Sequence, residues 1–176
     1  MYLPIRQLQL EPTRFNETYQ PGAIDFFDPQ LRQAAPILSS GIAELSPALM
    51  EIRVRGHLAT TMESACDRCL EPVRLPVDTD FSLVYRPAAQ SPEHGEVSIE
   101  ESEIEVGFYE GEGLDLADVL REQILLSLPM HRLCREDCKG ICPVCGRNRN
   151  VAECSCRVET ADDRWAGLKQ IQKLPL

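Results

Sequence analysis

Apolar and polar residues alternate along two long stretches in the first half of the chain. In residues 51–64 the apolar side chains fall on one face, at Ile52, Val54, Leu58 and Met62. In residues 73–85 they again fall on one face, at Val73, Leu75, Val77, Phe81, Leu83 and Tyr85. A period of two is typical of a strand with one buried face. The pattern predicts two long neighbouring strands joined by a hairpin-like connection that contains the sequence CDRCL.

Weaker patterns surround this pair of strands. They predict shorter strands at residues 2–10, 36–45 and 103–109. Residues 29–33 begin with a proline and predict the start of a short helix. Phe26 and Phe27 are large apolar residues in a segment with little other pattern, and we expect both of them in the core.

The clearest helix covers residues 115–128. Asp115 is a favourable N-cap, and Asp118 three residues later resembles the second half of a capping box. The apolar side chains then follow the helical period and widen one face, at Leu116, Val119, Leu120, Ile124, Leu125, Leu126 and Leu128. Pro129 predicts the end of the helix, because the residue before a proline disfavours helical backbone.

A shorter amphipathic helix is predicted over residues 162–173, with its apolar side chains at Trp165, Leu168 and Ile171. Together the elements predict an α+β fold in two parts. Residues 1–130 are expected to form a β-rich body, an antiparallel β-sheet or partly open barrel with the helix at 115–128 packed against it. Residues 131–176 are expected to form a cysteine-rich tail that ends in the short helix.

Eight cysteines lie in two regions of the chain. Cys66 and Cys69 form a C-x2-C pair in the predicted hairpin, and six more lie between residues 134 and 156. The first residues lack the apolar core and cleavage site of a signal peptide, and no apolar run is long enough to cross a membrane. We therefore expect a cytoplasmic protein with reduced thiols. Clustered C-x2-C pairs then favour metal over disulfides, and four cysteines are the ligand set of a closed zinc site.

The eight cysteines divide into two zinc sites in more than one way. The division that we favour places one ion on the tail, at Cys142, Cys145, Cys154 and Cys156. Gly146 permits the positive φ that such a turn needs. The other ion then lies between the hairpin and the tail, at Cys66, Cys69, Cys134 and Cys138. The rival division places one ion at Cys134, Cys138, Cys142 and Cys145. The remaining four cysteines are then far apart in the sequence.

Charge is distributed unevenly along the chain. The formal net charge is −10, which counts against a simple nucleic-acid binder. Residues 1–130 carry 9 Lys and Arg against 22 Asp and Glu, whereas residues 131–176 carry 9 against 6. The acidic part attracts basic proteins and repels phosphates. The tail carries basic side chains that are either solubilising charge or candidate contacts to phosphates. They are Arg132, Arg135, Lys139, Arg147 and Arg149.

Motifs of common enzymes are absent from the sequence. It contains no nucleophile elbow, P-loop, dinucleotide-binding fingerprint or HExxH helix. A catalytic zinc keeps an open coordination position, whereas four cysteines close the site. We therefore expect no enzymatic activity and no small-molecule substrate. Of the three histidines, His131 is a candidate additional ligand because it lies near Cys134.

Several motifs follow one another in a distinctive order. They are CDRCLEP, LREQILLSLPMHRLC, DCKGICPVCGRNRN, CSC and DDRWAGLKQI. In this order they resemble the bacterial YceD-like family of large ribosomal RNA subunit accumulation proteins, over residues 50–173. The chain departs from the usual pattern at Arg149, where Leu is common, which argues against a buried role for this side chain. The resemblance implies a non-catalytic assembly factor needed for accumulation of large-subunit ribosomal RNA.

We therefore expect a factor of large ribosomal subunit biogenesis that binds two zinc ions. Its expected partners are a large-subunit rRNA precursor, a basic ribosomal protein, or both. A thiol-based redox or zinc-sensing regulator is the alternative reading, in which oxidation of the thiolates releases the metal. A metal-dependent nuclease is a third reading, and it requires ligands other than thiolate.

Overall fold

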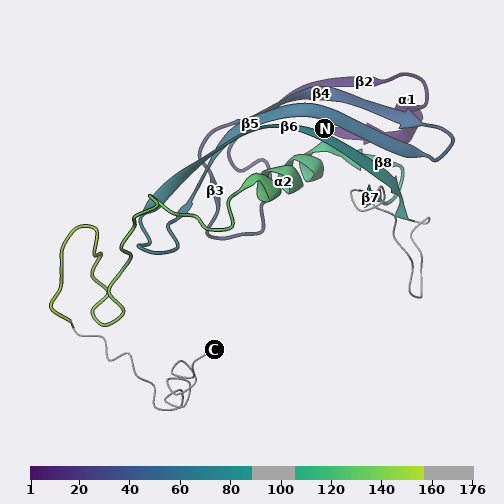
Figure 1. The fold of residues 1–176 in the computed structure, drawn as a ribbon. Coiled ribbons are helices and arrows are strands. Elements are labelled where there is room, and N and C mark those ends of the chain that lie inside the picture. Colours follow the sequence, from purple (N-terminus) through teal and green to yellow (C-terminus); the bar gives the residue numbers. More distant parts are fainter. Residues whose placement is uncertain (89–105, 157–176) are drawn as a thin grey trace, which may run out of the picture.

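The computed structural model describes residues 1–88 and 106–156, and this part of the chain is mostly β (Figure 1). Its elements are β1 (Tyr2–Pro4), α1 (Ile5–Leu8), β2 (Thr13–Tyr19), β3 (Arg32–Gln33), β4 (Ile37–Ser46), β5 (Glu51–Ala65), β6 (Pro72–Pro87), β7 (Val106–Tyr109), β8 (Gly113–Asp115) and α2 (Leu116–Ser127). The predicted pair of long strands is confirmed as β5 and β6. The helix predicted at 162–173, and the first part of the strand predicted at 103–109, lie outside the described residues.

Several expectations for the N-terminal third are wrong in part. The segment expected as one strand at 2–10 is the short strand β1 followed by the single helical turn α1. Residues 29–33 hold a turn and then β3 instead of a helix start. Phe26 is buried, but Phe27 is 76% exposed, and the Arg121 guanidinium lies 5.0 Å from its ring centroid. Phe27 has a φ of 54°, so the backbone turns between the two rings and only Phe26 packs inward.

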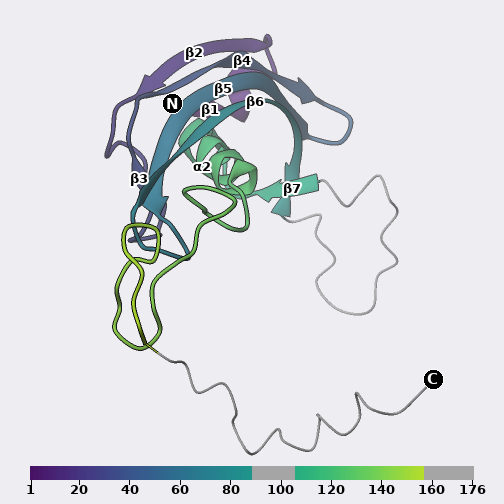
Figure 2. The same ribbon diagram turned by 60° about the vertical axis from the view of Figure 1, so that its left-hand side comes forward.

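Six strands form one large sheet, in the order β2-β4-β5-β6-β7 with β3 also paired to β5. All pairings are antiparallel except that of β6 with β7, which is parallel. The sheet is therefore mixed, not antiparallel throughout as the alternation predicted. β1 and β8 form a separate two-stranded sheet. Figure 2 shows the large sheet arching over α2, and its end strands β2 and β7 are not paired with each other, so the arch stays open.

Two glycines face each other where β4 and β5 pair, at Gly41 and Gly56. A Cβ on Gly41 would overlap the carbonyl oxygen of Arg55 and would lie 2.5 Å from the ring of Phe15. A Cβ on Gly56 would lie 3.0 Å from the ring of Phe81. The two aromatic rings thus occupy the space that the missing side chains leave. Glycines at such positions allow a sheet to bend, which suits the arch around α2.

The hydrophobic core lies between the concave face of the sheet and α2. β5 contributes the side chains that the alternation predicted, and all are fully buried: Ile52, Val54, Leu58 and Met62. The helix contributes one buried stripe at helical spacing, namely Leu116, Val119, Leu120 and Ile124. Burying each such side chain contributes roughly 1.5–3 kcal/mol. The packing therefore fixes α2, and with it the start of the cysteine-rich segment, against the sheet.

The ends of α2 follow the sequence signals closely. The Asp115 carboxylate accepts a hydrogen bond from the backbone N–H of Ala117 at 3.0 Å. Asp118 pairs with the guanidinium of Arg121 at 2.9 Å, so its side chain supports the first turn through an ion pair. The helix ends at Ser127, and Leu128 before the proline is extended, with a ψ of 143°.

We expect Leu120→Ala to lower the free energy of unfolding by about 2–5 kcal/mol, because it removes a fully buried side chain between α2 and the sheet. Leu126→Ala on the same helix is the matched control, since Leu126 is 72% exposed and should cost roughly 0.5 kcal/mol or less. Chemical denaturation monitored by circular dichroism measures both. Equal losses for the two variants would contradict the packing described here.

Candidate metal centres

The first cysteine pair lies where the buried face of β5 reaches the end of the hairpin. The inward alternation of this strand continues through Ser64 to Cys66, which is fully buried. The backbone N–H of Cys66 donates to the carbonyl oxygen of Glu71 at 2.8 Å, and the N–H of Leu70 donates to the carbonyl oxygen of Cys66 at 2.9 Å. Leu70 has a φ of 64°. This tight turn directs the sulfurs of Cys66 and Cys69 to the same side.

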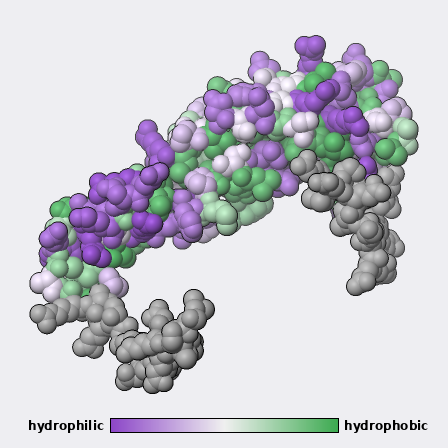
Figure 3. All heavy atoms as spheres, in the orientation of Figure 1, coloured by the Kyte–Doolittle hydropathy of each residue, from purple (hydrophilic) through white to green (hydrophobic). Residues whose placement is uncertain are grey.

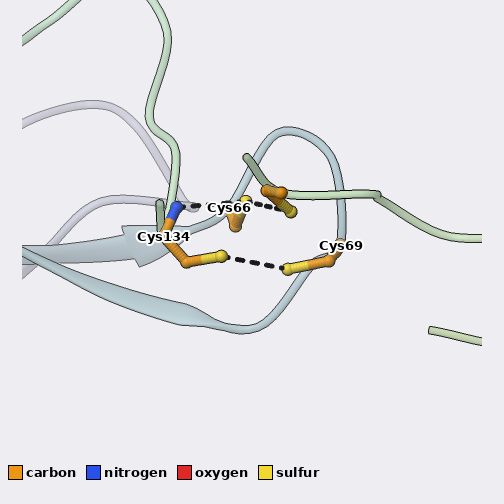
Figure 4. Close-up of side chains that lie close together, drawn as sticks. Cys66, Cys69 and Cys134 are labelled. Carbon is orange, nitrogen blue, oxygen red and sulfur yellow. Dashed lines mark hydrogen bonds between the residues drawn. The ribbon is translucent and has the colours of Figure 1, made fainter. Parts of the chain in front are cut away.

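The first quartet brings this pair together with Cys134 and Cys138, as the favoured division expects (Figure 4). The sulfurs of Cys66 and Cys138 are 3.9 Å apart, and those of Cys69 and Cys134 are 3.6 Å apart. A disulfide would require about 2.05 Å, and all eight cysteines are free thiols. Four sulfurs at 2.3 Å from a tetrahedral zinc are separated by about 3.8 Å. The spacing therefore fits one metal ion.

The cysteine-rich segment is attached to the hairpin turn by backbone hydrogen bonds. Asp67 donates its N–H to the carbonyl oxygen of Arg132 at 2.9 Å, and its carboxylate accepts from the Arg132 N–H at 2.7 Å. The Arg68 guanidinium donates to the carbonyl oxygen of Cys138 at 3.1 Å. The carbonyl oxygen of Arg68 accepts from the N–H of Ile141 at 2.9 Å. These contacts hold the turn at Cys66 and Cys69 next to the turn at Cys134 and Cys138, and they do not depend on a metal ion.

The second quartet lies entirely within the segment after α2 and consists of Cys142, Cys145, Cys154 and Cys156. All ligand atoms of this quartet, as of the first, lie within 4.8 Å of one another. The turn is closed by the N–H of Gly146, which donates to the carbonyl oxygen of Cys142 at 2.8 Å. Gly146 has a φ of 70°, as its position after the cysteine predicted. Cys145 and Cys156 are exposed, whereas three cysteines of the first quartet are buried.

Asn150 connects the two quartets. It lies in the loop between the cysteine pairs of the second quartet, yet its side-chain amide donates to the Cys138 sulfur of the first at 3.2 Å. Its side-chain oxygen accepts from the backbone N–H of Lys139 at 2.8 Å and from the Arg135 guanidinium at 2.9 Å. The Asn148 side-chain oxygen in turn accepts from the N–H of Asn150 at 2.9 Å. Donors of this kind orient metal ligands and tune their charge. The sequence did not identify Asn150 as a site residue, and the one available signal was the repeated Asn in the sequence RNRN.

The thiols within each quartet differ in how easily they ionise. Burial raises the pKa of Cys66, but backbone N–H donors, led by that of Cys69, outweigh burial and lower the pKa to about 6. Burial and then the neighbouring thiols raise the pKa of Cys134 to about 12. In the second quartet, N–H donors of its turn lower the pKa of Cys142 to about 6. The neighbouring Cys145 thiol, and then partial loss of water around the sulfur, raise the pKa of Cys156 to about 12. A cation at the centre of a quartet would favour the ionised form of all four thiols, because it would offset their negative charges.

The five candidate RNA-contacting residues have different surroundings. The Arg132 guanidinium is half-buried and pairs with the Asp28 carboxylate at 3.2 Å, so it joins the segment to the body. Arg135 is tied to Asn150, and the Arg147 guanidinium donates to the Glu153 carbonyl oxygen at 3.4 Å. Lys139 and Arg149 are exposed and together line a hollow of about 430 Å³. His131 is exposed and belongs to neither quartet.

Comparisons with known proteins agree with the family resemblance. The sequence model of the family described as "Large ribosomal RNA subunit accumulation protein YceD" matches residues 54–172. An uncharacterised protein of Mycobacterium tuberculosis is 34% identical over 121 residues, which cover 68% of this chain and 55% of the mycobacterial protein. A Zea mays protein named "Large ribosomal RNA subunit accumulation protein YCED homolog 1, chloroplastic" is 23% identical over 151 residues, covering 68% of this chain and 52% of the plant protein.

The extent of the match differs among these relatives. This chain spans about half the length of the mycobacterial and plant proteins. An uncharacterised protein of Bacillus subtilis is 22% identical over 172 residues, which cover 96% of this chain and 93% of that protein. No solved structure matches the chain. Within residues 1–88 and 106–156, no helix combines the length and the apolar character needed to cross a membrane.

The paired replacement of Cys154 and Cys156 by Ser should reduce the bound metal from two ions per chain to one, because it removes half the ligands of the second quartet only. Elemental mass spectrometry of the reduced, desalted protein measures the metal content. The corresponding change in the first quartet, Cys66→Ser with Cys69→Ser, should also leave one bound ion per chain, in the second quartet. Loss of both ions from the Cys154 and Cys156 variant would show that the quartets do not bind independently.

Asn150→Ala should accelerate metal release from the first quartet, because the Cys138 thiolate loses a donor at 3.2 Å. Loss of such an outer donor lowers metal affinity by roughly 10–100-fold. Transfer of metal to a chromophoric chelator measures the rate, with the second quartet removed by Cys154→Ser and Cys156→Ser so that one ion is followed. Val151→Ala is the control, since Val151 is 81% exposed. Equal rates in the two variants would refute a role for Asn150.

Proposed function

Because the chain belongs to the YceD family, we propose that it is a non-catalytic, zinc-binding factor of large ribosomal subunit biogenesis. In this role it is needed for accumulation of large-subunit rRNA and binds an rRNA precursor, a basic ribosomal protein, or both. The names of the plant relatives state a role in accumulation of this RNA. Such a function implies action where large subunits assemble, which in a bacterial cell is the cytoplasm.

The observation that carries the proposal is the convergence of eight thiols into two quartets, in each of which the ligand atoms lie within 4.8 Å of one another. In the first quartet two of the sulfur distances, 3.9 and 3.6 Å, are those of a tetrahedral site. Zinc is the ion that we propose, since four cysteines are a usual ligand set of structural zinc. When bound, zinc supplies charge and a fixed geometry, and it supplies folding free energy to a segment that has little core. Four protein ligands leave no position for substrate or water, which supports a binding role.

A redox or zinc-sensing regulator is the second candidate. It is favoured by one feature of the second quartet, in which Cys145 and Cys156 are exposed. Exposed thiolates are the ones that oxidants reach first. In that case low micromolar peroxide would release one zinc quickly and change the activity of the protein, whereas slow release without such a change supports the assembly factor.

We expect the purified, zinc-loaded protein to co-sediment with large-subunit precursors on sucrose gradients, because its proposed partners are components of these particles. Low salt is used because salt screens contacts between charged groups. Depletion of the protein should lower large-subunit rRNA relative to small-subunit rRNA, measured by quantitative electrophoresis of total RNA. The protein should also leave precursor RNA uncleaved in vitro across a metal titration. Absence of the protein from every precursor fraction, together with unchanged rRNA ratios, would refute the proposal.

A further inference from the structure

An apolar groove of about 700 Å³ lies beside α2 at the end of the molecule away from the cysteines. It is bounded by β1, β7, β8 and the helix. Its exposed apolar side chains are Tyr2 at 52%, Phe108 at 50%, Leu125 at 37% and Leu126 at 72%. Figure 3 shows hydrophobic atoms gathered on this concave side of the body over α2, next to hydrophilic ones. Exposed apolar side chains that line one hollow are typical of an interaction site.

Acidic side chains surround this groove. Its lining includes the carboxylates of Glu110, Asp115, Asp118 and Glu122. Among the described residues that line it, Arg121 is the one cation, and it is already paired with Asp118 at 2.9 Å. The N-terminal amino group lies 3.9 Å from Asp115, which offsets one further charge. Glu110 and Glu122 thus leave the groove with a negative charge beside its apolar side chains.

The groove continues along the helix into a second hollow. This hollow has a volume of about 470 Å³ and shares Tyr85, Glu122 and Leu126 with the first. The Tyr85 hydroxyl donates to the Glu122 carboxylate at 3.5 Å, so this carboxylate lies where the two hollows meet. Their shared lining makes one elongated surface instead of a closed pocket. An elongated groove suits a peptide segment better than a compact small molecule.

We propose that this groove docks a basic amphipathic segment of a protein, which inserts apolar side chains between Phe108 and Leu126 and places Lys or Arg against Glu110 and Glu122. The proposal rests on the proposed function and specifies the partner as a basic protein. The charge of the groove selects this occupant, since opposite charges across an interface favour encounter. An RNA strand would bring phosphates against the carboxylates, which repel them. The exposed apolar side chains of the groove provide the contacts that anchor the segment.

Site-specific photocrosslinking tests the proposal. The photoreactive residue p-benzoylphenylalanine replaces Leu126 in the groove or, as the control, Leu38, which is 54% exposed on β4. The probes are total proteins extracted from purified large ribosomal subunits and, separately, large-subunit rRNA. The protein probe should yield a crosslink to one basic protein from position 126 and none from position 38. No crosslink from position 126, crosslinks from both positions, or crosslinks to rRNA alone would overturn the proposal.

The contributions of charge and shape are then tested by measuring how groove variants bind the partner protein that the crosslink identifies. This partner protein is purified and carries a fluorescent label. Leu126→Asp, and Glu110→Gln combined with Glu122→Gln, should each weaken binding by roughly ten-fold or more in fluorescence anisotropy. Leu38→Asp is the matched control and should leave binding unchanged. If the groove variants bind normally while the protein still co-sediments with precursors, the groove proposal fails and the proposed function stands. If co-sedimentation is also absent, the proposed function fails as well.

Discussion

The convergence of four cysteine sulfurs at the end of the β5–β6 hairpin is the interaction on which the cysteine-rich segment depends. Residues 131–156 contain no helix or strand beyond one isolated bridge, and their buried apolar contacts are few. Hydrophobic burial therefore cannot hold this segment in place. Its position comes from hydrogen bonds to the backbone around Asp67 and Arg68 and from the shared thiols. In such a segment, metal binding and folding are the same equilibrium.

The core and the first quartet are separate clusters of buried residues that β5 places one after the other. The alternation that buries Ile52 and Leu58 in β5 also brings Cys66 inward, because Cys66 directly follows the strand and continues the same alternation. The arch of the sheet, which Gly41 and Gly56 permit, holds α2 across that face. The helix then delivers the chain back toward the hairpin. A change that flattened the sheet would therefore disturb both the core and the meeting of the cysteine turns.

The sequence predicted the features that depend on local pattern. The strands β5 and β6 and the limits of α2 follow from periodicity and capping. Spacing favoured the division of the eight cysteines that the structure shows, but it left the rival division open. The sequence did not predict the parallel pairing of β7, because strand direction depends on the path of a long connection. Nor did it predict Asn150, whose partner Cys138 belongs to the other quartet. Phe27 illustrates the same limit, since its positive φ decides its exposure and composition does not reveal φ.

The acidic groove and the basic side chains of the tail lie in different parts of the structure. The groove lies beside α2 and β7, whereas Lys139 and Arg149 belong to the segment that follows α2, and this segment lies at the other end of the arch (Figure 1). Exposed charges in salt solution interact mainly with their near neighbours, because the Debye length is about 8 Å at physiological ionic strength. A basic protein held in the groove would therefore leave the tail cations available for phosphates. Under the proposals above, a basic protein and an RNA would therefore contact different parts of the chain and would not compete for one surface.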